Sequence, residues 1–311
     1  MGDVTRVAIT GASGFIGRAT VAAAVKAGLE VVAVQRSAVA LGTGVASVAI
    51  DLGDDAAVPA LVDALDRVDA VIHLAAAMSG DAQEHARLTI GGTARLTRAM
   101  AEAGTRRLTL ASSIAVFDTS HVPIGGTLTD DCPLVTPEAP RDAYSGAKVA
   151  QENLAKAADL DTLAILRPGI VHDADHLWNA HLGMGVGPVL FRSGGDDPLP
   201  MCHVNHCAAA LVQATVRQVD GAFTVIDRIV PTRAKVIDAL RRGGWPKMVV
   251  PVPWRAVSSL AKRLQKQRNK LPGLLREEVL RQRMLPMRYD FTRPDWANAL
   301  PEEKTPWGAV Q

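Results

Sequence analysis

Thr10-Gly11-Ala12-Ser13-Gly14-Phe15-Ile16-Gly17 is the stretch of sequence that decides the fold. It follows the apolar run Arg6–Thr10, which predicts a strand, and it opens an alanine-rich pattern that predicts a helix over Gly17–Ala27. A glycine-rich turn between a strand and a helix lets the backbone approach a pyrophosphate, whose charge the helix N-terminus stabilises. We therefore expect this turn to bind a dinucleotide through Gly11, Ser13, Gly14, Phe15, Ile16 and Gly17.

The first two-thirds of the chain alternate short apolar runs with helical patterns. Further helices are expected over 58–65 and 93–103, and further strands over 31–35, 48–50, 70–74, 108–111, 163–166 and 222–226. Strands that are apolar throughout and alternate with helices indicate a parallel sheet covered on both faces. We predict an α/β fold, a Rossmann-type doubly wound parallel sheet with a smaller C-terminal substrate-binding domain.

The expected domains follow from a change of character along the chain. Residues 1–171 form the dinucleotide-binding Rossmann domain, and residues 201–227 are expected to return to it. Residues 172–200 and 228–311 are left for the substrate-binding domain, whose elements we do not place one by one.

Composition excludes several other classes of protein. The chain has 311 residues, a formal net charge of +2 and 4% aromatic residues, so nothing indicates a nucleic-acid partner. Cys132, Cys202 and Cys207 fit neither a zinc nor a disulfide spacing, and we expect reduced thiols. No apolar stretch approaches the roughly 18 residues that span a bilayer, and no signal peptide is expected. We expect a cytoplasmic protein that acts on a small-molecule substrate.

Residues after the second and third expected strands bear on the cofactor. Gln35-Arg36-Ser37 has no acid where NAD sites usually present Asp or Glu to the ribose 2′-hydroxyl. The planar guanidinium of Arg36 suits a 2′-phosphate, so NADP(H) is favoured. NAD(H) stays open, because a loop arginine can also simply face solvent. Asp51 and Leu52 are expected beside the adenine, and room for the ribose is expected at Leu74, Ala75 and Ala76.

Tyr144 and Lys148 lie four residues apart, which places a phenol and an ammonium on one face of a helix. A free tyrosine titrates near pH 10, and we expect the neighbouring cation to lower that pKa. Lys148 is also placed to hold the nicotinamide ribose. Ser113 follows the expected strand 108–111, from where its hydroxyl can bond the substrate oxygen that Tyr144 protonates or deprotonates. These three residues are the expected catalytic set.

With these motifs in this order, the chain resembles the extended short-chain dehydrogenase/reductase family, the NAD-dependent epimerase/dehydratase group. The resemblance rests on the glycine turn and on His73–Ala76, Ser112–Phe117, Tyr144–Lys148, Leu166–Val171 and Met201–Val204. It implies a Rossmann domain, a smaller substrate domain and a homodimer. It also implies further cofactor contacts at Thr89, Tyr144, Lys148, Pro168, Gly169, Ile170 and Val171.

Three positions bear on the branch within that family. Thr89 stands where many nucleotide-sugar epimerases have Asn, and with Arg36 it is similar to dihydroflavonol-reductase-like members. Leu199 stands where sugar-nucleotide enzymes commonly have an Arg that binds the substrate diphosphate, and His206 replaces a usual Asp. We therefore expect an NADP(H)-dependent oxidoreductase that interconverts a ketone and a secondary alcohol. The alternatives are a nucleotide-sugar epimerase or dehydratase with a retained cofactor, and an NADP-binding protein without turnover, which the intact acid–base set disfavours.

Five histidines fall between residues 172 and 206, and two of them raise a metal alternative. His172 and His176, with Asp173 and Asp175 nearby, would line up as ligands if that stretch were helical. The resembling family uses no metal, so we expect these side chains to line the substrate cleft and assign no metal.

Residues 251–293 are strongly basic, with eleven Lys/Arg against three acids. Within them Trp254, Val257, Leu260, Ala261 and Leu264 recur at helical spacing. A basic amphipathic helix either binds an anionic membrane or an acidic partner, or packs on the core with a solvated basic face. We expect the packed helix, and therefore no peripheral membrane contact.

Overall fold

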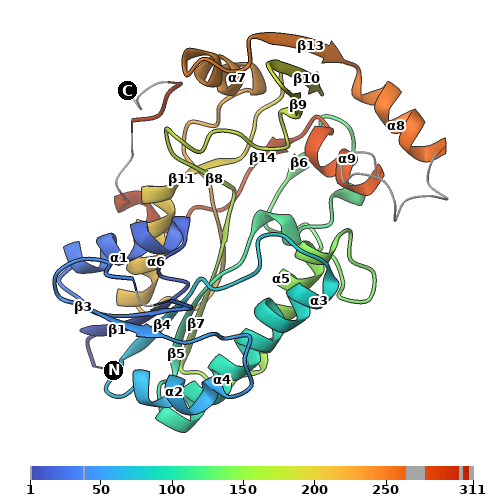
Figure 1. Cartoon of the computed structure of the whole chain (residues 1–311). Coiled ribbons are helices and arrows are strands. Elements are labelled where there is room, and N and C mark those ends of the chain that lie inside the picture. Colours follow the sequence, from blue (N-terminus) through green and yellow to red (C-terminus); the bar gives the residue numbers. More distant parts are fainter. Residues whose placement is uncertain (1, 38, 264–276, 301–303, 308–311) are drawn as a thin grey trace.

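The computed structural model of the chain describes residues 2–37, 39–263, 277–300 and 304–307 (Figure 1). A seven-stranded parallel sheet forms its centre, in the order β12-β7-β5-β4-β1-β2-β3. Its strands are β1 (Arg6–Thr10), β2 (Glu30–Gln35), β3 (Val45–Ala49), β4 (Ala70–His73), β5 (Arg107–Ala111), β7 (Thr162–Pro168) and β12 (Gly221–Val225). The order reverses between β1 and β4, which is where a doubly wound sheet leaves a crevice at the carboxyl ends of its strands.

Helices cover both faces of this sheet (Figure 1). One face carries α1 (Phe15–Lys26) and α6 (Val204–Val216), and the other carries α2 (Ala57–Ala64), α4 (Gly91–Ala103) and α5 (Ala143–Ala157). Alternate residues of each strand enter the two cores: in β1, Val7 and Ile9 pack on the α1 side and Ala8 packs on the α2 side. A strand buried on both faces needs apolar residues throughout. The predicted Rossmann-type α/β fold is confirmed.

A smaller lobe lies beyond the carboxyl ends of the sheet, at the top of Figure 1. We define it as the three-stranded sheet β13-β10-β9 with α7 and α8. Its elements are β9 (Gly183–Val186), β10 (Val189–Ser193), α7 (Arg233–Arg242), β13 (Met248–Val252) and α8 (Trp254–Arg263). The strands β8 (Ile170–His172) and β11 (Met201–His203) pair with each other where the chain leaves and re-enters the Rossmann part.

The remaining elements are short. They comprise α3 (Ala82–His85), the π-helical turn η1 (Ala86–Ile90), η2 (Ile114–Val116), η3 (Thr119–His121), β6 (Thr127–Leu128), α9 (Glu277–Met284), β14 (Arg288–Tyr289) and η6 (Asp295–Ala299). The domain boundaries predicted from the sequence stay a prediction. The basic amphipathic stretch is helical as α8, but its expected continuation through Leu264 lies outside the described residues. No described helix combines the length and the apolar character that crossing a membrane requires.

Candidate active site

The glycine turn is shaped by close backbone contacts. Gly11 has a φ of +68°, and a Cβ added at Gly17 would overlap the carbonyl oxygen of Gly11. Gly14 is the N-cap of α1, with no side-chain cap and no acid in the first turn. The first N–H groups of α1 are therefore open to an anion, and the helix dipole favours negative charge there. The turn fits the pyrophosphate of a dinucleotide.

Two other predicted segments meet this turn. A Cβ at Gly11 would lie 2.9 Å from the backbone nitrogen of Ala75, so the turn closes on the segment after β4. The ring of Phe15 is 37% exposed and lies 4.5 Å, centroid to centroid, from the ring of His176. His176 thus comes to the mouth of the glycine turn from a loop far along the chain, which the sequence did not reveal.

The predicted adenine and 2′-phosphate residues lie at the ends of the next two strands. Arg36 is exposed at the end of β2. Asp51 accepts the Gly53 N–H at 2.9 Å and pairs with Arg87, Oδ2 to Nη1, at 3.6 Å. Leu52 is buried against Gly92. Their contacts with a cofactor stay predictions.

Thr89 and Gly169 hold backbone segments in place. The Thr89 hydroxyl accepts the N–H of Ala77 at 3.0 Å and so fixes the segment after β4. A Cβ at Gly169 would overlap the carbonyl oxygen of Pro200, so the crossing of β7 into β8 requires glycine. Both positions shape the crevice, whether or not they also contact a cofactor directly.

Tyr144 and Ser113 come together at the start of α5 and the end of β5. Asp142 caps α5: its carboxylate accepts the Ser145 N–H at 2.8 Å, and the Ser145 hydroxyl accepts the Asp142 N–H. This capping box fixes Tyr144 in the first turn. Burial raises the pKa of Tyr144, although a hydrogen bond with the Ser113 hydroxyl acts in the opposite direction.

Lys148 lies one turn further along α5 and is completely enclosed. Its Nζ donates to the carbonyl oxygen of Ala111 at 2.8 Å and to Oε1 of Gln151 at 2.9 Å. Desolvation lowers the pKa of Lys148 to about 8. The expected lowering of the Tyr144 pKa by this cation is not found: desolvation and the nearby carboxylate of Asp142 raise the pKa, and the Ser113 hydroxyl is what opposes them.

A chain of buried hydrogen bonds connects Lys148 to the glycine turn. Gln151 Nε2 donates to the hydroxyl of Thr93 at 2.9 Å, and that hydroxyl lies 2.9 Å from His73 Nε2. His73 Nδ1 is 2.6 Å from the hydroxyl of Thr10, the residue that precedes the turn. Burial lowers the pKa of His73 to about 3, so the imidazole is neutral. The network holds the lysine and the cofactor turn in one fixed arrangement.

Sequence reasoning missed Thr93 and Gln151. Gln151 follows Lys148 by three residues and shares its helix face, and that spacing was the available signal. It missed His85 as well. The His85 ring lies edge-on to Tyr144, 6.0 Å between centroids, and its Nδ1 has no hydrogen-bond partner among the described residues.

A buried ion pair supports the other side of α5. Arg167 donates to Glu152 from Nε at 2.9 Å and from Nη2 at 2.8 Å, and the Ser112 hydroxyl donates to the same carboxylate at 2.6 Å. Burial alone would raise the pKa of Glu152, but these partners hold it below its usual value. Because Ser112 precedes Ser113, the pair also fixes the predicted catalytic serine.

Four arginines gather between this site and the smaller lobe, and we call Arg141, Arg192, Arg233 and Arg283 the arginine group. Arg141 donates to the carbonyl oxygen of Ala115 at 2.8 Å, two residues after Ser113. Burial lowers the pKa of Arg141, Arg233 and Arg283 alike. His181 is half-buried among them, and desolvation together with three of these cations lowers its pKa to about 3.

The neighbouring carboxylates neutralise only part of the positive charge of the arginine group. Arg141 pairs with Asp142 at 3.4 Å and Arg233 with Asp197 at 3.3 Å. Among the described residues, no ion pair involves Arg283, and the buried Nε of Arg192 has no hydrogen-bond partner. A region with more buried cations than carboxylates suits an anion.

The metal alternative for His172 and His176 does not match the structure, because the stretch is a strand followed by a loop. His176 pairs with Asp173, whereas His172 is buried and lies 3.1 Å from Oδ2 of Asp227. Asp227 also accepts from the backbone N–H of His203, and its Oδ1 lies 2.9 Å from Nδ1 of His206. Burial opposes ionisation of Asp227, but these donors lower its pKa to about 2.

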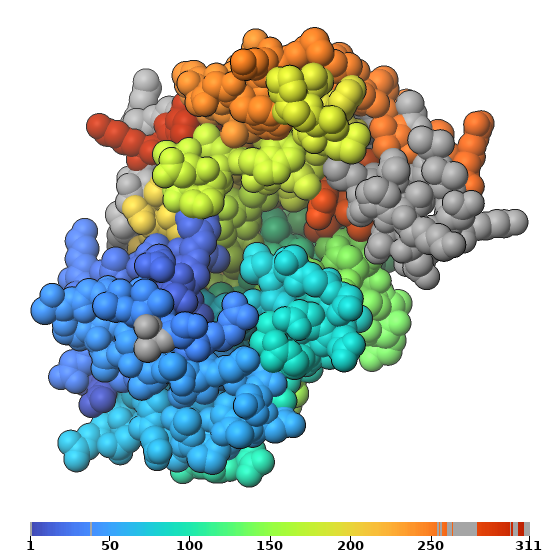
Figure 2. Space-filling view, viewed as in Figure 1, coloured from blue at the N-terminus to red at the C-terminus, as the bar shows by residue number. Residues whose placement is uncertain are grey.

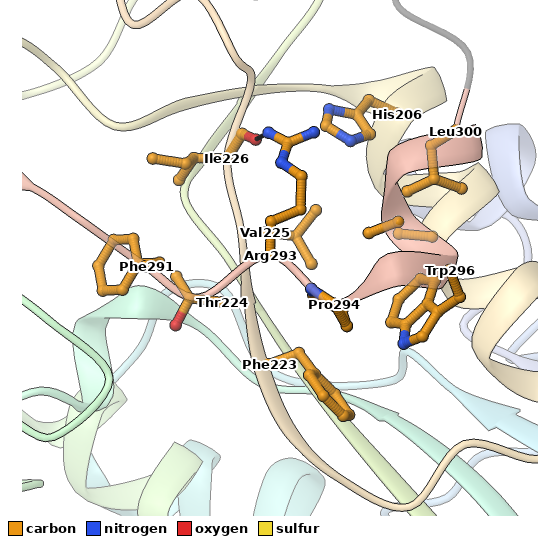
Figure 3. A pocket seen from close by; sticks show the side chains of 12 residues that line it. His206, Phe223, Thr224, Val225, Ile226, Phe291, Arg293, Pro294, Trp296 and Leu300 are labelled. Atoms are coloured by element: carbon orange, nitrogen blue, oxygen red, sulfur yellow. Dashed lines mark hydrogen bonds between the residues drawn. The ribbon is translucent and has the colours of Figure 1, made fainter.

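Cys202 lies beside this carboxylate, so Cys202, His206 and Asp227 have metal-ligand spacing. Asp227 already accepts hydrogen bonds at direct contact distance, so we assign the group a structural role. A small pocket adjoins it, lined by β12, by α6 and by residues 291–300 (Figure 3). There Arg293 Nη2 donates to the carbonyl oxygen of Ile226 at 3.2 Å. None of the predicted catalytic residues lines that pocket.

Comparison with known proteins agrees with this arrangement. MoeE5 in complex with UDP-glucose and NAD is similar over 96% of this chain and 92% of that chain, at 22% identity and a TM-score of 0.66. A short-chain dehydrogenase/reductase superfamily protein from Agrobacterium tumefaciens with bound NAD matches over 80% and 86%, at 24% identity and a TM-score of 0.64. UDP-glucose 4-epimerase from Thermus thermophilus, in complex with NAD, matches over 80% and 86%, at 23% identity and a TM-score of 0.63.

A search by sequence among curated proteins gives no match. The sequence model of the NAD dependent epimerase/dehydratase family matches residues 7–169. This range holds the glycine turn, Ser113, Tyr144 and Lys148 and covers more than half of the chain. The chain therefore belongs to the NAD-dependent epimerase/dehydratase family.

Proposed function

We propose that this enzyme acts on a nucleotide sugar as an epimerase or dehydratase that retains its nicotinamide cofactor. The arginine group carries the proposal, because guanidinium groups near the segment that follows Ser113 suit a substrate diphosphate. The UDP-sugars and NAD bound by similar structures support it. The sequence favoured a ketone reductase instead, from Thr89 and Arg36 together with Leu199 and His206, which replace an arginine and an aspartate. Leu199 is buried in the smaller lobe, and Arg233 and Arg283 supply cations from other segments.

In this proposal Tyr144 exchanges the proton of the sugar hydroxyl. Its raised pKa keeps the phenol protonated at rest, so it donates when the carbonyl is reduced and needs Lys148 nearby when it accepts. Ser113 hydrogen-bonds the same substrate oxygen and orients it. A nicotinamide dinucleotide held by the glycine turn would supply the hydride acceptor.

Three further expectations accompany the proposal, and each comes from the sequence or from the family resemblance. Thr89 and Arg36 favour the dihydroflavonol-reductase-like branch, which makes a ketone reductase the second candidate. The homodimer follows only from the family resemblance. The cytoplasmic location follows from the three free cysteines, whose spacing fits no disulfide framework.

We expect the enzyme to turn over UDP-glucose, UDP-N-acetylglucosamine or UDP-glucuronic acid without exchanging its cofactor. The purified protein should convert at least one of them with no added cofactor and no net change in nicotinamide absorbance. Arg283→Ala should raise KM by about 10- to 150-fold, the value of a lost charge-assisted contact, with a smaller change in kcat. Arg98→Ala, which alters an exposed arginine of α4, is the matched control.

A net absorbance change that matches product formation would identify a simple dehydrogenase or reductase and refute the retained-cofactor cycle. Equal KM values for the wild type and Arg283→Ala would remove the arginine group from the substrate site.

Arg36 tests the cofactor assignment. The similar structures contain NAD, whereas an exposed arginine at the end of β2 favours NADP(H). If the guanidinium binds the 2′-phosphate, Arg36→Ala should weaken NADP⁺ binding by about 10- to 150-fold and leave NAD⁺ binding nearly unchanged. Isothermal titration of both cofactors against both proteins measures this. Equal losses for the two cofactors would contradict an Arg36 contact with the phosphate.

A further inference from the structure

The sheet of the smaller lobe buries only one of its faces. Leu190 of β10 is fully buried and packs with Val236 and Ile237 of α7. The register places Gly185 and Val249 beside Leu190 on this inner face. Because successive side chains of a strand alternate between faces, the residues next to them point outward. The outer apolar face consists of Met184, Val186, Val189, Phe191, Met248 and Val250.

This outer apolar face is open to solvent. Met184, Val186 and Met248 are 52%, 54% and 54% exposed. Val189 pairs with both Val186 and Met248, so one apolar row crosses all three strands. None of the six belongs to a hydrophobic cluster of the described residues. Scattered exposed apolar residues are ordinary, whereas a contiguous set marks an interaction surface.

The same surface is basic and free of acids. Residues 183–193 and 241–263 contain no Asp or Glu, although the whole chain carries only +2. They contain six Lys/Arg besides Arg192, which lies on the inner face of β10 with Leu190 and belongs to the arginine group. Arg241, Lys247, Arg255 and Arg263 are exposed. Figure 2 shows the yellow-green β9 and β10 beside the orange residues of this segment, at the top of the molecule.

Helix α8 extends this surface, because it begins two residues after β13 ends. In this helix Arg255 and Arg263 are exposed, and Val257 is half-buried. Apolar residues and cations are therefore combined in the helix as they are in the neighbouring sheet.

We infer that the smaller lobe docks onto an anionic lipid bilayer through the outer apolar face and α8. Apolar side chains enter the boundary between headgroups and acyl chains, and cations are attracted to the anionic lipids. A second copy of this chain would place cations opposite the same cations, which repel each other. An acidic protein would account for the cations of this surface but not for the exposed apolar row. The sequence favoured a packed helix without membrane contact, whereas the present inference rests on the exposed sheet beside that helix.

Co-sedimentation of the full chain with vesicles tests this inference. Vesicles of equal parts phosphatidylcholine and phosphatidylglycerol should bind at least about 10-fold more tightly than pure phosphatidylcholine, and added salt should weaken binding. Lys247→Gln and Arg255→Gln should each weaken binding by about fivefold. Met184→Ser with Met248→Ser should weaken it further, because these exposed side chains supply the insertion.

Val25→Ser and Lys26→Gln on α1 change the same kinds of side chain far from this surface and should leave vesicle binding unchanged. All six substitutions leave the catalytic and arginine groups intact, so turnover of a soluble substrate separates this inference from the proposed function. Equal binding to neutral and anionic vesicles would overturn it. So would a dimer in light scattering that Met184→Ser dissociates, since the face would then be covered by a second copy.

Discussion

Replacing Tyr144 with Phe should lower turnover by about 10²- to 10⁴-fold, the usual cost of a lost general acid or base. The change removes the hydroxyl that bonds Ser113 and keeps the buried ring against His85. Folding and cofactor binding should therefore survive. Steady-state kinetics on the accepted substrate, together with cofactor titration, measure the two effects separately.

Lys148→Met is the companion variant, and it should impair cofactor affinity as well as turnover. Burial lowers the pKa of Lys148 to about 8, so a group that titrates near pH 8 should appear in the wild-type pH–rate profile. The same group should persist in the residual activity of Tyr144→Phe and disappear in Lys148→Met. Near-normal turnover by Tyr144→Phe would show that the assigned mechanism is wrong.

Replacing Arg167 with Met should lower the free energy of unfolding by about 3–5 kcal/mol. The reason is that Glu152, whose side chain is 0% exposed, would lose both guanidinium donors and keep its buried charge, with the half-exposed Lys156 at 3.4 Å as its remaining cation. Urea denaturation followed by circular dichroism measures the change. Activity should fall too, because Ser112 bonds the same carboxylate next to the catalytic serine.

Two further variants test whether the buried charge of Glu152 causes that loss of stability. Adding Glu152→Gln to Arg167→Met removes the stranded charge and should recover part of the stability. Arg98→Met breaks an exposed pair with Glu102 and should cost at most about 1 kcal/mol. A loss of that small size for Arg167→Met would mean that the buried pair is not a main support of α5.

Local patterns made the Rossmann part predictable, and they also led to the proposed catalytic set. Arg6–Thr10 is a strand from end to end, and Gly104 ends α4 with a φ of +73°, because apolar alternation and glycine caps act within a few residues. Ser113, Tyr144 and Lys148 were expected from their spacing on such elements. These features are determined by the local sequence rather than by contacts with distant parts of the chain.

The arginine group illustrates what the sequence could not reveal. Arg141, Arg192, Arg233 and Arg283 come from four separate segments, and each alone is an ordinary cation that usually faces solvent. Their proximity depends on how the smaller lobe packs on the loop after β5. The position of His176 over Phe15 arises in the same way, from a loop that crosses the cofactor turn. Such contacts are fixed by tertiary packing and leave no periodic signal.

The hydrogen bonds to Asp227 restrict how this protein can be recombined with its relatives. His172 precedes the smaller lobe in the chain, whereas His206 and Asp227 lie between its two segments. A chimera with a crossover between His172 and Asp227, made with a relative that lacks one of these imidazoles, would leave the buried carboxylate of Asp227 without one of its side-chain donors. Viable crossovers must therefore keep His172, His206 and Asp227 together, and residues 172–227 are inherited as one block.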